Sequence, residues 1–324
     1  MTRSPVCDKA RRVTFDYLFG GLSIRSALSI DGLRDNPSPV GQPDMLLTAE
    51  IGAPLVADRD HYRWPGRYGL RLGSYRGQWL MQSSFDGSFL IARDGRSIHV
   101  VCEALPPGPA LADVLVRRVL PRVATLSGAT AIHAAALAGQ DGGLLLLGPS
   151  GAGKSTLSAA LAHFLGWEIL SDDISILREK DEVPMLAAAA TGVCVWPQSR
   201  EGLGLPPGDC FAMPGYDGKL RYDPRRERMT GAVPLRGFVF LDRSADCAAP
   251  MVERLSLATG VAQVVPQIIR FNPEGASSAE RIAGLVALTG AMRTAPVWRL
   301  SYPASYAALP AVAATLGALA TTPL

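Results

Sequence analysis

The segment from Gly148 to Thr156, GPSGAGKST, has the residue types and spacing of a phosphate-binding loop. It fits the pattern GxxxxGK[ST], in which glycines let the backbone curl so that successive N–H groups converge on phosphate oxygens. Lys154 would bring positive charge to the β- and γ-phosphates, and the Ser155 hydroxyl would be a ligand of Mg²⁺. The motif therefore predicts a site for ATP and Mg²⁺. Its candidate nucleotide-binding residues are Gly148, Ser150, Gly151, Ala152, Gly153, Lys154, Ser155 and Thr156.

Two features argue against the alternative interpretation, a glycine-rich turn that holds a lysine by chance. Lysine is scarce, because only four of the 32 basic residues are lysines, whereas glycine is common, at 33 residues. The loop also follows a run of four leucines, Leu144–Leu147, and precedes a helical pattern over Lys154–Leu165 that Gly166 should end. We therefore expect a strand, the loop and a helix in succession, with the positive end of the helix dipole at the phosphates.

Asp172 and Asp173 are the next candidates, because they follow Lys154 by 18 and 19 residues. This interval holds one helix and a turn, so we expect the strand that carries the pair, within residues 167–177, to lie beside the strand of the loop. Two acids within an apolar strand are costly unless a cation pairs with them, and Mg²⁺ and Lys154 are suitable cations. One carboxylate would hold the metal, and the other would accept a proton from an attacking hydroxyl. The alternative is a solvated pair at the end of a strand.

His133 lies in the apolar segment AIHAAAL, 15 residues before Gly148, within a strand that we expect over Ala131–Leu137. A single histidine among small apolar neighbours is more often a core residue than a catalyst. From the residues alone, both interpretations of His133 stay open.

The segments IHAAAL, LLLLGPSGAGKST and ILSDDISIL together resemble the core of the HPr kinase/phosphorylase family. The resemblance covers roughly residues 130 to 178 and implies a fold of the phosphoenolpyruvate carboxykinase type, which is a P-loop variant. It also implies that Asp172 is the general base towards a seryl hydroxyl and that Asp173 and Ser155 hold Mg²⁺. In this family a histidine at the position of His133 assists near the transferring phosphoryl group. The catalytic residues implied are Asp172, Asp173, His133 and Lys154.

Other details bring the chain closer to one part of that family. Thr156 follows the GKS sequence where the HPr enzymes have Glu. The chain looks more like the short HPr-kinase-like proteins of peptide-modifying gene clusters, among them kinases of lasso-peptide precursors. Segments Tyr17–Leu28 and Pro296–Pro303 resemble the two ends of that group. The resemblance implies a peptide or small protein with an acceptor serine as the partner, and it leaves a homo-oligomer open because the HPr kinases are hexamers.

A basic turn in a long Gly- and Pro-rich segment, residues 198–231, supplies further candidates. Lys219 and Arg221, in DGKLRY, could reach the γ-phosphate or a carboxylate of the substrate, since both phosphoryl transfer and carboxylate binding need a cation. We include both among the nucleotide-binding candidates. The alternative is a solvated basic loop.

The elements that position these residues fall into two regions of the sequence, one rich in strands and one that mixes strands and helices. A chain of 324 residues is long enough for two domains. Up to about residue 105, short apolar runs alternate with Gly, Asp and Pro, which is typical of strands joined by turns. A helix over Ala110–Val123 and alternating strands and helices follow. We therefore expect an α/β protein with a small β-rich N-terminal domain at residues 1–105. Residues 106–324 should form a P-loop kinase domain of the HPr kinase and phosphoenolpyruvate carboxykinase type.

Composition disfavours several other classes of protein. The net charge of +3 gives no general basic field, so we expect no nucleic-acid partner. We find no apolar run suited to a signal peptide or a membrane span, so we expect no membrane association. The cysteines show no CxxC pair, which argues against a zinc site or disulfides and favours the cytoplasm. They are Cys7, Cys102, Cys194, Cys210 and Cys247.

The sequence thus predicts an ATP- and Mg²⁺-dependent serine kinase, acting on a peptide or small protein. Two alternatives stay open. A kinase for a small hydroxylated molecule, such as free serine, would use the same core. A nucleotide-binding switch would bind ATP without transferring its phosphoryl group, although such a protein has no need of a second acid as a base.

Overall fold

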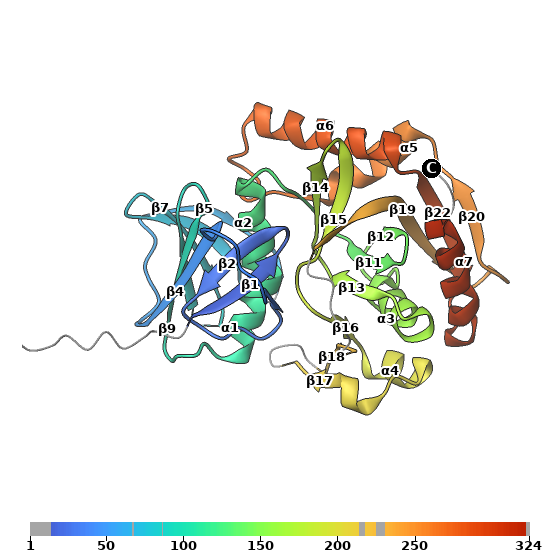
Figure 1. Cartoon of the computed structure of the whole chain (residues 1–324), viewed down its shortest axis with the longest axis horizontal. Coiled ribbons are helices and arrows are strands. Elements are labelled where there is room, and N and C mark those ends of the chain that lie inside the picture. Colours follow the sequence, from blue (N-terminus) through green and yellow to red (C-terminus); the bar gives the residue numbers. More distant parts are fainter. Residues whose placement is uncertain (1–13, 67, 86, 214–217, 225–230, 322–324) are drawn as a thin grey trace, which may run out of the picture.

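The structure is a computed structural model that describes residues 14–66, 68–85, 87–213, 218–224 and 231–321 of the chain. It has a mixed α/β architecture with two large sheets and one small sheet (Figure 1), so the expected α/β class is confirmed. Within the described residues, no helix is both long and apolar enough to cross a membrane.

Residues 15–102 form a nine-stranded sheet with the strand order β3-β1-β2-β4-β9-β8-β7-β6-β5. Most neighbouring strands are antiparallel, whereas β4 runs parallel to both β2 and β9. Buried and partly exposed residues alternate along β2 (LSIRS), so that one face of the strand points into a core. The strands are β1 Phe15–Phe19, β2 Leu22–Ser26, β3 Arg34–Asp35, β4 Met45–Ile51, β5 Arg59–Arg63, β6 Arg71–Tyr75, β7 Gln78–Ser83, β8 Gly87–Ile91 and β9 Ser97–Cys102.

A helical segment follows this sheet and lies between it and the rest of the chain (Figure 1). It consists of α1 (Pro109–Val114), a π-helical turn η1 (Leu115–Val119) and α2 (Leu120–Leu126). Pro121 lies at the start of α2, directly after the π-helical turn, and the helical segment continues through it. The buried side chains of the segment share one core with the nine-stranded sheet. The domain boundary near residue 105 stays a prediction, and by packing this helical segment belongs with the sheet before it.

The second large sheet has ten strands and carries the phosphate-binding loop. Its strand order is β13-β11-β12-β19-β15-β14-β10-β21, and β22 pairs with β19 and β20. Strands β12, β19 and β22 are parallel to one another, and the remaining pairs are antiparallel. The strands are β10 Thr130–Ile132, β11 Ala135–Gly139, β12 Gly142–Leu147, β13 Glu168–Ser171, β14 Ser175–Lys180, β15 Val183–Ala187, β19 Ala232–Ser244, β20 Met251–Arg254, β21 Ile268–Ile269 and β22 Val297–Pro303.

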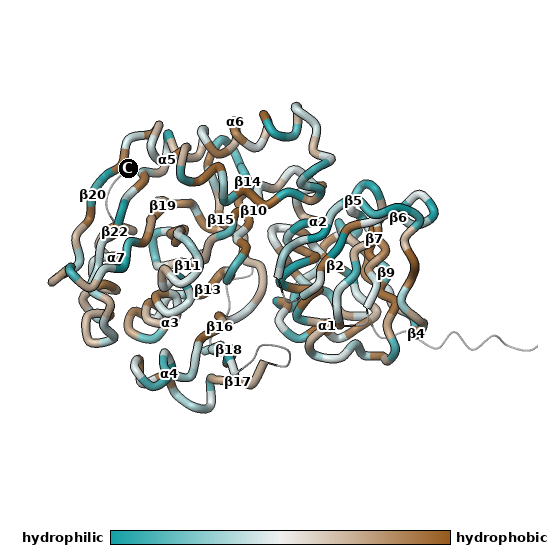
Figure 2. Tube along the Cα trace, turned by 180° about the vertical axis from the view of Figure 1, so that it is seen from behind, coloured by the Kyte–Doolittle hydropathy of each residue, from teal (hydrophilic) through white to brown (hydrophobic). Residues whose placement is uncertain are grey.

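Helices cover both faces of this sheet at β12, which explains why every leucine in Leu144–Leu147 is buried. Alternate leucines pack in one core with α3 (Lys154–Leu165) and α7 (Leu309–Thr321). The other two pack in a second core with α5 (Leu257–Val264) and α6 (Ser278–Thr294). In Figure 2, brown apolar segments accordingly run through β10 and β19 in the interior.

Two strands that the sequence predicts as continuous are interrupted. The run over Ala131–Leu137 is β10 and β11, with His133 and Ala134 between them. The run over residues 167–177 is β13 and β14, with residues 172–174 in a turn between them. The expected placement of the acid pair beside the loop strand is also wrong, because β11 forms an antiparallel hairpin with β12 and thereby separates β13 from it.

The Gly- and Pro-rich segment is more structured than a loop. It contributes to a small three-stranded sheet of order β16-β18-β17. Residues 225–228 of the basic stretch after Arg221 lie outside the described residues. The elements here are β16 Val193–Val195, α4 Pro197–Leu203, the short helix η2 Pro207–Asp209, β17 Cys210–Ala212 and β18 Leu220–Tyr222, and two further short helices are η3 Val265–Gln267 and η4 Tyr306–Ala308.

Candidate active site

The phosphate-binding loop connects the end of β12 to the first residue of α3. The φ angles of Gly148, Gly151 and Gly153 are 144°, 84° and 97°, values that residues other than glycine rarely adopt. Gly153 is the N-cap of α3 and offers no side chain to the N–H groups of the first turn. A Cβ at Gly153 would overlap the hydroxyl of Tyr302, which donates to the carbonyl of Ala152 at 2.6 Å. The loop therefore has the curled geometry in which a helix N-terminus can receive an anion.

Lys154 lies across this loop with 8% of its surface exposed. Its Nζ donates to the carbonyl oxygens of Gly148, at 2.7 Å, and Pro149, at 3.3 Å. Burial lowers the pKa of Lys154, and the charges of Asp173 and Asp172 oppose that shift. The ammonium group is thus held within the loop by two carbonyl oxygens, which phosphate oxygens could replace as partners.

Asp172 is 3% exposed and has a hydrogen bond at each oxygen. Its Oδ1 accepts from Ser155 Oγ at 3.1 Å, and its Oδ2 accepts from the backbone N–H of Cys194 at 2.8 Å. Burial raises the pKa of Asp172, and the neighbouring charge of Asp173 adds to the effect. Since Ser155 lies in the first turn of α3, the fold brings the acid pair to the phosphate-binding loop.

Asp173 occupies the turn between β13 and β14 with a left-handed φ of 69°. Its Oδ2 forms an ion pair with Nη2 of Arg118 at 2.7 Å. Burial alone would raise the pKa of Asp173, but the charge of Arg118 and its hydrogen bond lower the pKa below its ordinary value. Ser175 ties this turn to the neighbouring one, because its hydroxyl donates to the carbonyl of Ala134 at 2.9 Å.

His133 lies in that neighbouring turn, between β10 and β11, and is partly buried. Its backbone N–H donates to the carbonyl of Gln267 at 2.7 Å. Burial and the charge of Lys154 lower the pKa of His133, while Asp173 opposes the shift. The imidazole is therefore neutral at neutral pH and lies within electrostatic range of both the loop lysine and the acid pair.

A cavity of about 300 Å³ adjoins the acid pair. Lys219 reaches it, with its Nζ 5.0 Å from the centre of the Trp196 ring. Arg221 instead pairs with Asp31 at 2.7 Å and is not among the residues that line this cavity. The lining residues are Tyr68, Arg118, Ser155, Asp172, Asp173, Cys194, Trp196 and Lys219.

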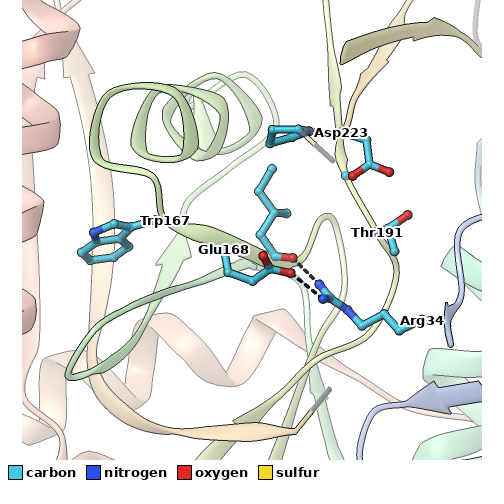
Figure 3. A pocket seen from close by; sticks show the side chains of 8 residues that line it. Arg34, Trp167, Glu168, Thr191 and Asp223 are labelled. Carbon is cyan, nitrogen blue, oxygen red and sulfur yellow. Dashed lines mark hydrogen bonds and ion pairs between the residues drawn. The ribbon is translucent and has the colours of Figure 1, made fainter. Parts of the chain in front are cut away.

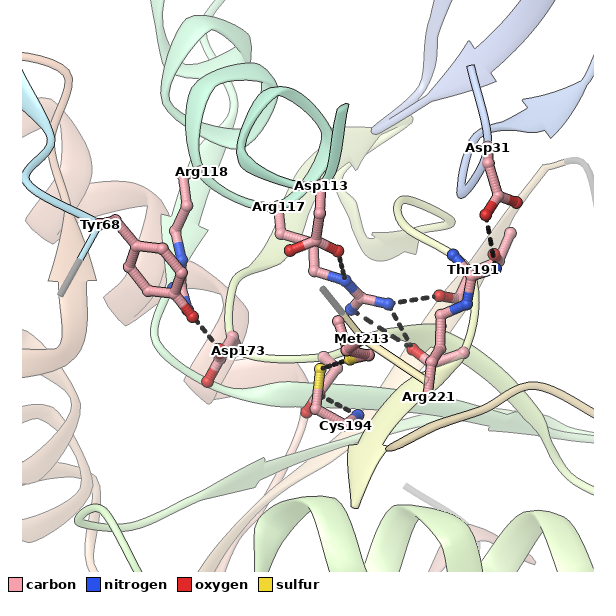
Figure 4. Close-up of polar contacts among 12 residues, drawn as sticks. Asp31, Tyr68, Asp113, Arg117, Arg118, Asp173, Thr191, Cys194, Met213 and Arg221 are labelled. Atoms are coloured by element: carbon pink, nitrogen blue, oxygen red, sulfur yellow. Dashed lines mark hydrogen bonds and ion pairs between the residues drawn. The ribbon is translucent and has the colours of Figure 1, made fainter. Parts of the chain in front are cut away.

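Sequence reasoning missed Tyr68, Arg118, Cys194 and Trp196 as residues of the site. Figure 4 shows Arg118 next to Asp173, to which it donates, with Tyr68 beside them. One signal could have found Arg118. Two adjacent arginines in a largely apolar helix need partners once they are buried, and an acid pair elsewhere in the chain is a suitable one.

Two other cavities help to locate the site. One of about 90 Å³ adjoins the N-terminus of α3 and is lined by residues that include Thr156, Arg243, Tyr302 and Tyr306. Another, of about 440 Å³, lies between α2, β21 and α6. The cavity of about 440 Å³ is the largest of these three, but neither the loop nor the acid pair lines it. We therefore place the chemistry at the cavity of about 300 Å³.

The residues present fit ATP and Mg²⁺. The loop offers a helix N-terminus and a lysine for the phosphates, and Ser155 and Asp172 offer the oxygen ligands that Mg²⁺ prefers. Among the described residues, no group of three or more His, Cys, Asp and Glu side chains could hold a metal ion. Mg²⁺ bound with a nucleotide needs only one or two protein oxygens beside phosphates and water.

Comparison with known proteins adds little to this geometry. No protein-family profile matches the chain, and no curated protein matches it. Among solved structures, the HPr(Ser) kinase/phosphatase from Coxiella burnetii is similar over 58% of this chain and 93% of that one, with 16% identity and a TM-score of 0.30. A likeness this small carries no argument about function, which therefore rests on the site.

Proposed function

We propose that this protein is an ATP- and Mg²⁺-dependent kinase that transfers the γ-phosphoryl group to a hydroxyl. One observation carries the proposal: the acid pair meets the first turn of α3 at a single cavity, through the 3.1 Å hydrogen bond between Ser155 and Asp172. Holding a phosphate chain requires the loop alone. A second carboxylate at the same cavity, Asp173, is a base for an incoming hydroxyl, which a passive nucleotide switch does not need.

In this proposal Ser155 and Asp172 hold the metal, directly or through water, because their oxygens already lie together. Asp173 accepts the proton of the acceptor hydroxyl, and its lowered pKa keeps it ionised at neutral pH. Mg²⁺, when bound with ATP, supplies positive charge that offsets the negative charge of the transferring phosphoryl group. These roles reverse the assignment that the family resemblance implies, and the hydrogen bond from Ser155 to Asp172 is the reason.

Lys154 and His133 act on the phosphates in the same proposal. Lys154 exchanges its carbonyl partners for the β- and γ-phosphates. Neutral His133 donates a hydrogen bond towards the transferring group. The nucleoside extends towards the cavity of about 90 Å³ beside Thr156, where the ring of Tyr306 is available.

For the acceptor we propose the serine of a peptide or small protein, with a lasso-peptide precursor as the candidate that the sequence resemblance implies. Tyr68 and Trp196 line the acceptor cavity, and Lys219 supplies a cation for the γ-phosphate or for a carboxylate of the acceptor. A cytoplasmic location, a homo-oligomeric state and the lack of a nucleic-acid partner stay predictions.

The proposal is tested by following labelled phosphate. The protein is incubated with Mg²⁺ and ATP labelled at the γ-position, together with a synthetic serine peptide or free L-serine. Label on the peptide is the expected result, and label on free serine would move the acceptor to a small molecule. Label found only as free phosphate, at a rate that neither acceptor changes, would reject the kinase and favour a nucleotide-binding switch.

A further inference from the structure

The π-helical turn η1 carries two adjacent arginines that both serve the acid pair. Arg118 pairs directly with Asp173. Arg117 points to the segment that leads into β16 (Figure 4). A π-turn is wider than an α-turn and is often found at functional sites. Here the π-turn directs the side chains of Arg117 and Arg118 towards the part of the chain that carries the acid pair.

Arg118 is fixed on more than one side. Its Cζ lies 4.6 Å from the centre of the Tyr68 ring, and its Nη2 also donates to the Tyr68 hydroxyl at 3.3 Å. The same Nη2 is 2.7 Å from Asp173 Oδ2. A planar guanidinium held over an aromatic ring has little rotational freedom. Arg118 therefore fixes the orientation of the Asp173 carboxylate as well as neutralising its charge.

Arg117 acts on the other acid through the backbone. It is 3% exposed, and its Nη2 donates to the carbonyl of Thr191 at 2.7 Å, while its Nε donates to Asp113 at 3.0 Å. Thr191 lies three residues before Cys194, whose N–H donates to Asp172 at 2.8 Å. One turn of the N-terminal half thus braces both carboxylates.

We propose that Arg118, held by Tyr68, is a positioning residue for phosphoryl transfer, and that the N-terminal half thereby forms one wall of the acceptor cavity. The inference rests on the proposed function and deepens it. In it, Arg118 holds Asp173 in its left-handed turn, facing the cavity, so that the carboxylate lies where the acceptor hydroxyl arrives. The N-terminal sheet is then part of the reaction site as well as a scaffold.

The location of this ion pair separates it from a purely structural one. The side chains of Arg118 and Asp173 are 15% and 32% exposed, and both line the cavity. By contrast, Arg34 and Glu168 form a bridge between the same two halves whose arginine is 1% exposed, and neither residue lines that cavity. The carboxylate of Asp173 can therefore meet an acceptor that enters the cavity, which Glu168 cannot.

The test compares Arg118→Ala, Arg118→Lys and Tyr68→Ala with the wild type. Transfer is followed from γ-labelled ATP to whichever of the serine peptide and free L-serine the wild type labels. Arg118→Ala should lower kcat about 100-fold, because Asp173, the base, would no longer be held in its position. The Kd for Mg²⁺·ATP should stay within two-fold, since in this inference Arg118 acts on Asp173 and not on the phosphates. Arg118→Lys should recover part of kcat, since it restores the charge without the planar fork. Tyr68→Ala should lower kcat and raise the KM of the acceptor, whose wall it removes.

Arg93→Ala is the matched control, because Arg93, in the turn between β8 and β9, also lies over an aromatic ring, 3.8 Å from the centre of Trp79, and does not line the cavity. It should leave kcat unchanged. The inference is overturned if Arg118→Ala keeps kcat within two-fold, or if it loses nucleotide binding and thermal stability together with kcat. Wild-type protein that binds Mg²⁺·ATP but labels neither acceptor would reject the proposed function, and this inference with it.

Discussion

Asp172 and Asp173 are adjacent in the chain but have different surroundings. Asp172 is buried between two neutral donors, and burial raises its pKa. Asp173 faces a cation, and Arg118 helps to lower its pKa against the effect of burial. Two carboxylates whose pKa values are moved apart can take different roles at one pH, one at the metal and one as a base.

Replacing Asp172 by Asn should stabilise the metal-free protein at neutral pH while it removes transfer. Because its pKa is raised, the folded state binds this proton more tightly than the unfolded state does. The associated stability is present below the unfolded pKa and is lost as pH rises through the folded pKa. Asn avoids that loss. Its oxygen can accept from the Cys194 N–H, and its amide can donate to Ser155 Oγ, whose hydroxyl then accepts instead of donating. We expect Tm at pH 7 to rise by about 1.5 °C, which for a chain of 324 residues corresponds to roughly 1 kcal/mol.

Differential scanning calorimetry between pH 4 and pH 8 checks this expectation. The difference in Tm between Asp172→Asn and the wild type should shrink as pH falls, because the wild-type carboxyl becomes protonated. A lower Tm at pH 7, or a difference that grows towards acid, would contradict the assigned environment of Asp172.

Replacing Lys154 by Ala should abolish nucleotide turnover and leave the fold intact. Its ammonium is the positive group held inside the loop, and loss of one such electrostatic contact typically lowers kcat by about 10²–10³-fold. Turnover of γ-labelled ATP and the circular dichroism spectrum are the measurements. Lys180→Ala is the control, because Lys180 is an exposed lysine at the end of β14. Equal turnover in the two variants would remove the phosphate-binding role of the loop.

At the scale of elements, helix α3 has a glycine with a positive φ at each end, and the two glycines have different structural roles. Gly153 begins the helix at the loop, and Gly166 ends it with a φ of 69°. Gly153 is also limited in space, because a Cβ there would overlap the Tyr302 hydroxyl, whereas Gly166 lies at the far end of the helix from the loop. The first glycine shapes a site, and the second ends a helix.

Gly153→Ala should therefore weaken nucleotide binding, and Gly166→Ala should not. Both substitutions strain a left-handed backbone, at a cost of about 1–3 kcal/mol. In Gly153→Ala the loop or Tyr302 must also move, so we expect the Kd for ATP to rise at least about 10-fold, a change of roughly 1.4 kcal/mol. Isothermal titration calorimetry with ATP, alongside thermal unfolding, separates the two effects. A similar Kd for both variants would show that the loop geometry does not matter for binding.

The sequence predicted α3 residue by residue, because its start and stop depend on glycines within the same few residues. The position of β13 could not be predicted in the same way. Whether β11 or β13 lies beside β12 depends on a hairpin between Ala135–Gly139 and Gly142–Leu147, and a consistent apolar pattern fits either arrangement. The turn at Asp173 was missed because the sequence gives no sign of the single residue that turns left-handed there. The turn at His133 was missed because its neighbours in the chain are apolar on both sides.

At the scale of the whole molecule, arginines tie the two large sheets together. Arg34 of β3 reaches Glu168 at 2.5 Å (Figure 3) and also donates to the carbonyl of Ile169. It donates to the carbonyl of Ala189 as well. Arg178 donates to the carbonyl of Gly20 in the opposite direction. These contacts keep the N-terminal sheet in a fixed position, which a wall of the acceptor cavity requires.

Arg34→Met should destabilise the protein by about 3 kcal/mol, because it leaves Glu168 and two carbonyl groups without a buried partner. Arg25→Met is the matched control, since Arg25 pairs with Asp16 at a more exposed position and should cost less than about 1 kcal/mol. Urea unfolding followed by tryptophan fluorescence compares the two. An equal loss of unfolding free energy in the two variants would mean that the ion pair between Arg34 and Glu168 stabilises the protein no more than an exposed ion pair does.

The contribution of the N-terminal half to the site lay beyond the reach of the sequence. Arg118 and Asp173 are 55 residues apart, and Tyr68 is 50 residues from Arg118. Local motifs mark the residues that bind phosphate, because that chemistry needs a contiguous loop. A charge partner from another sheet carries no such pattern, since only the packing of the two halves brings it to the acid pair.

The central claim, that the loop and the acid pair form one phosphoryl-transfer site, is tested most directly by a crystal structure with Mg²⁺ and a non-hydrolysable ATP analogue. We predict that the terminal phosphate lies within hydrogen-bonding distance of Lys154 Nζ, with the metal at Ser155 and Asp172. Asp173 should then face the terminal phosphate across the cavity of about 300 Å³. A nucleotide bound instead in the cavity of about 440 Å³ between α2 and α6, or a terminal phosphate turned away from Asp173, would contradict the account.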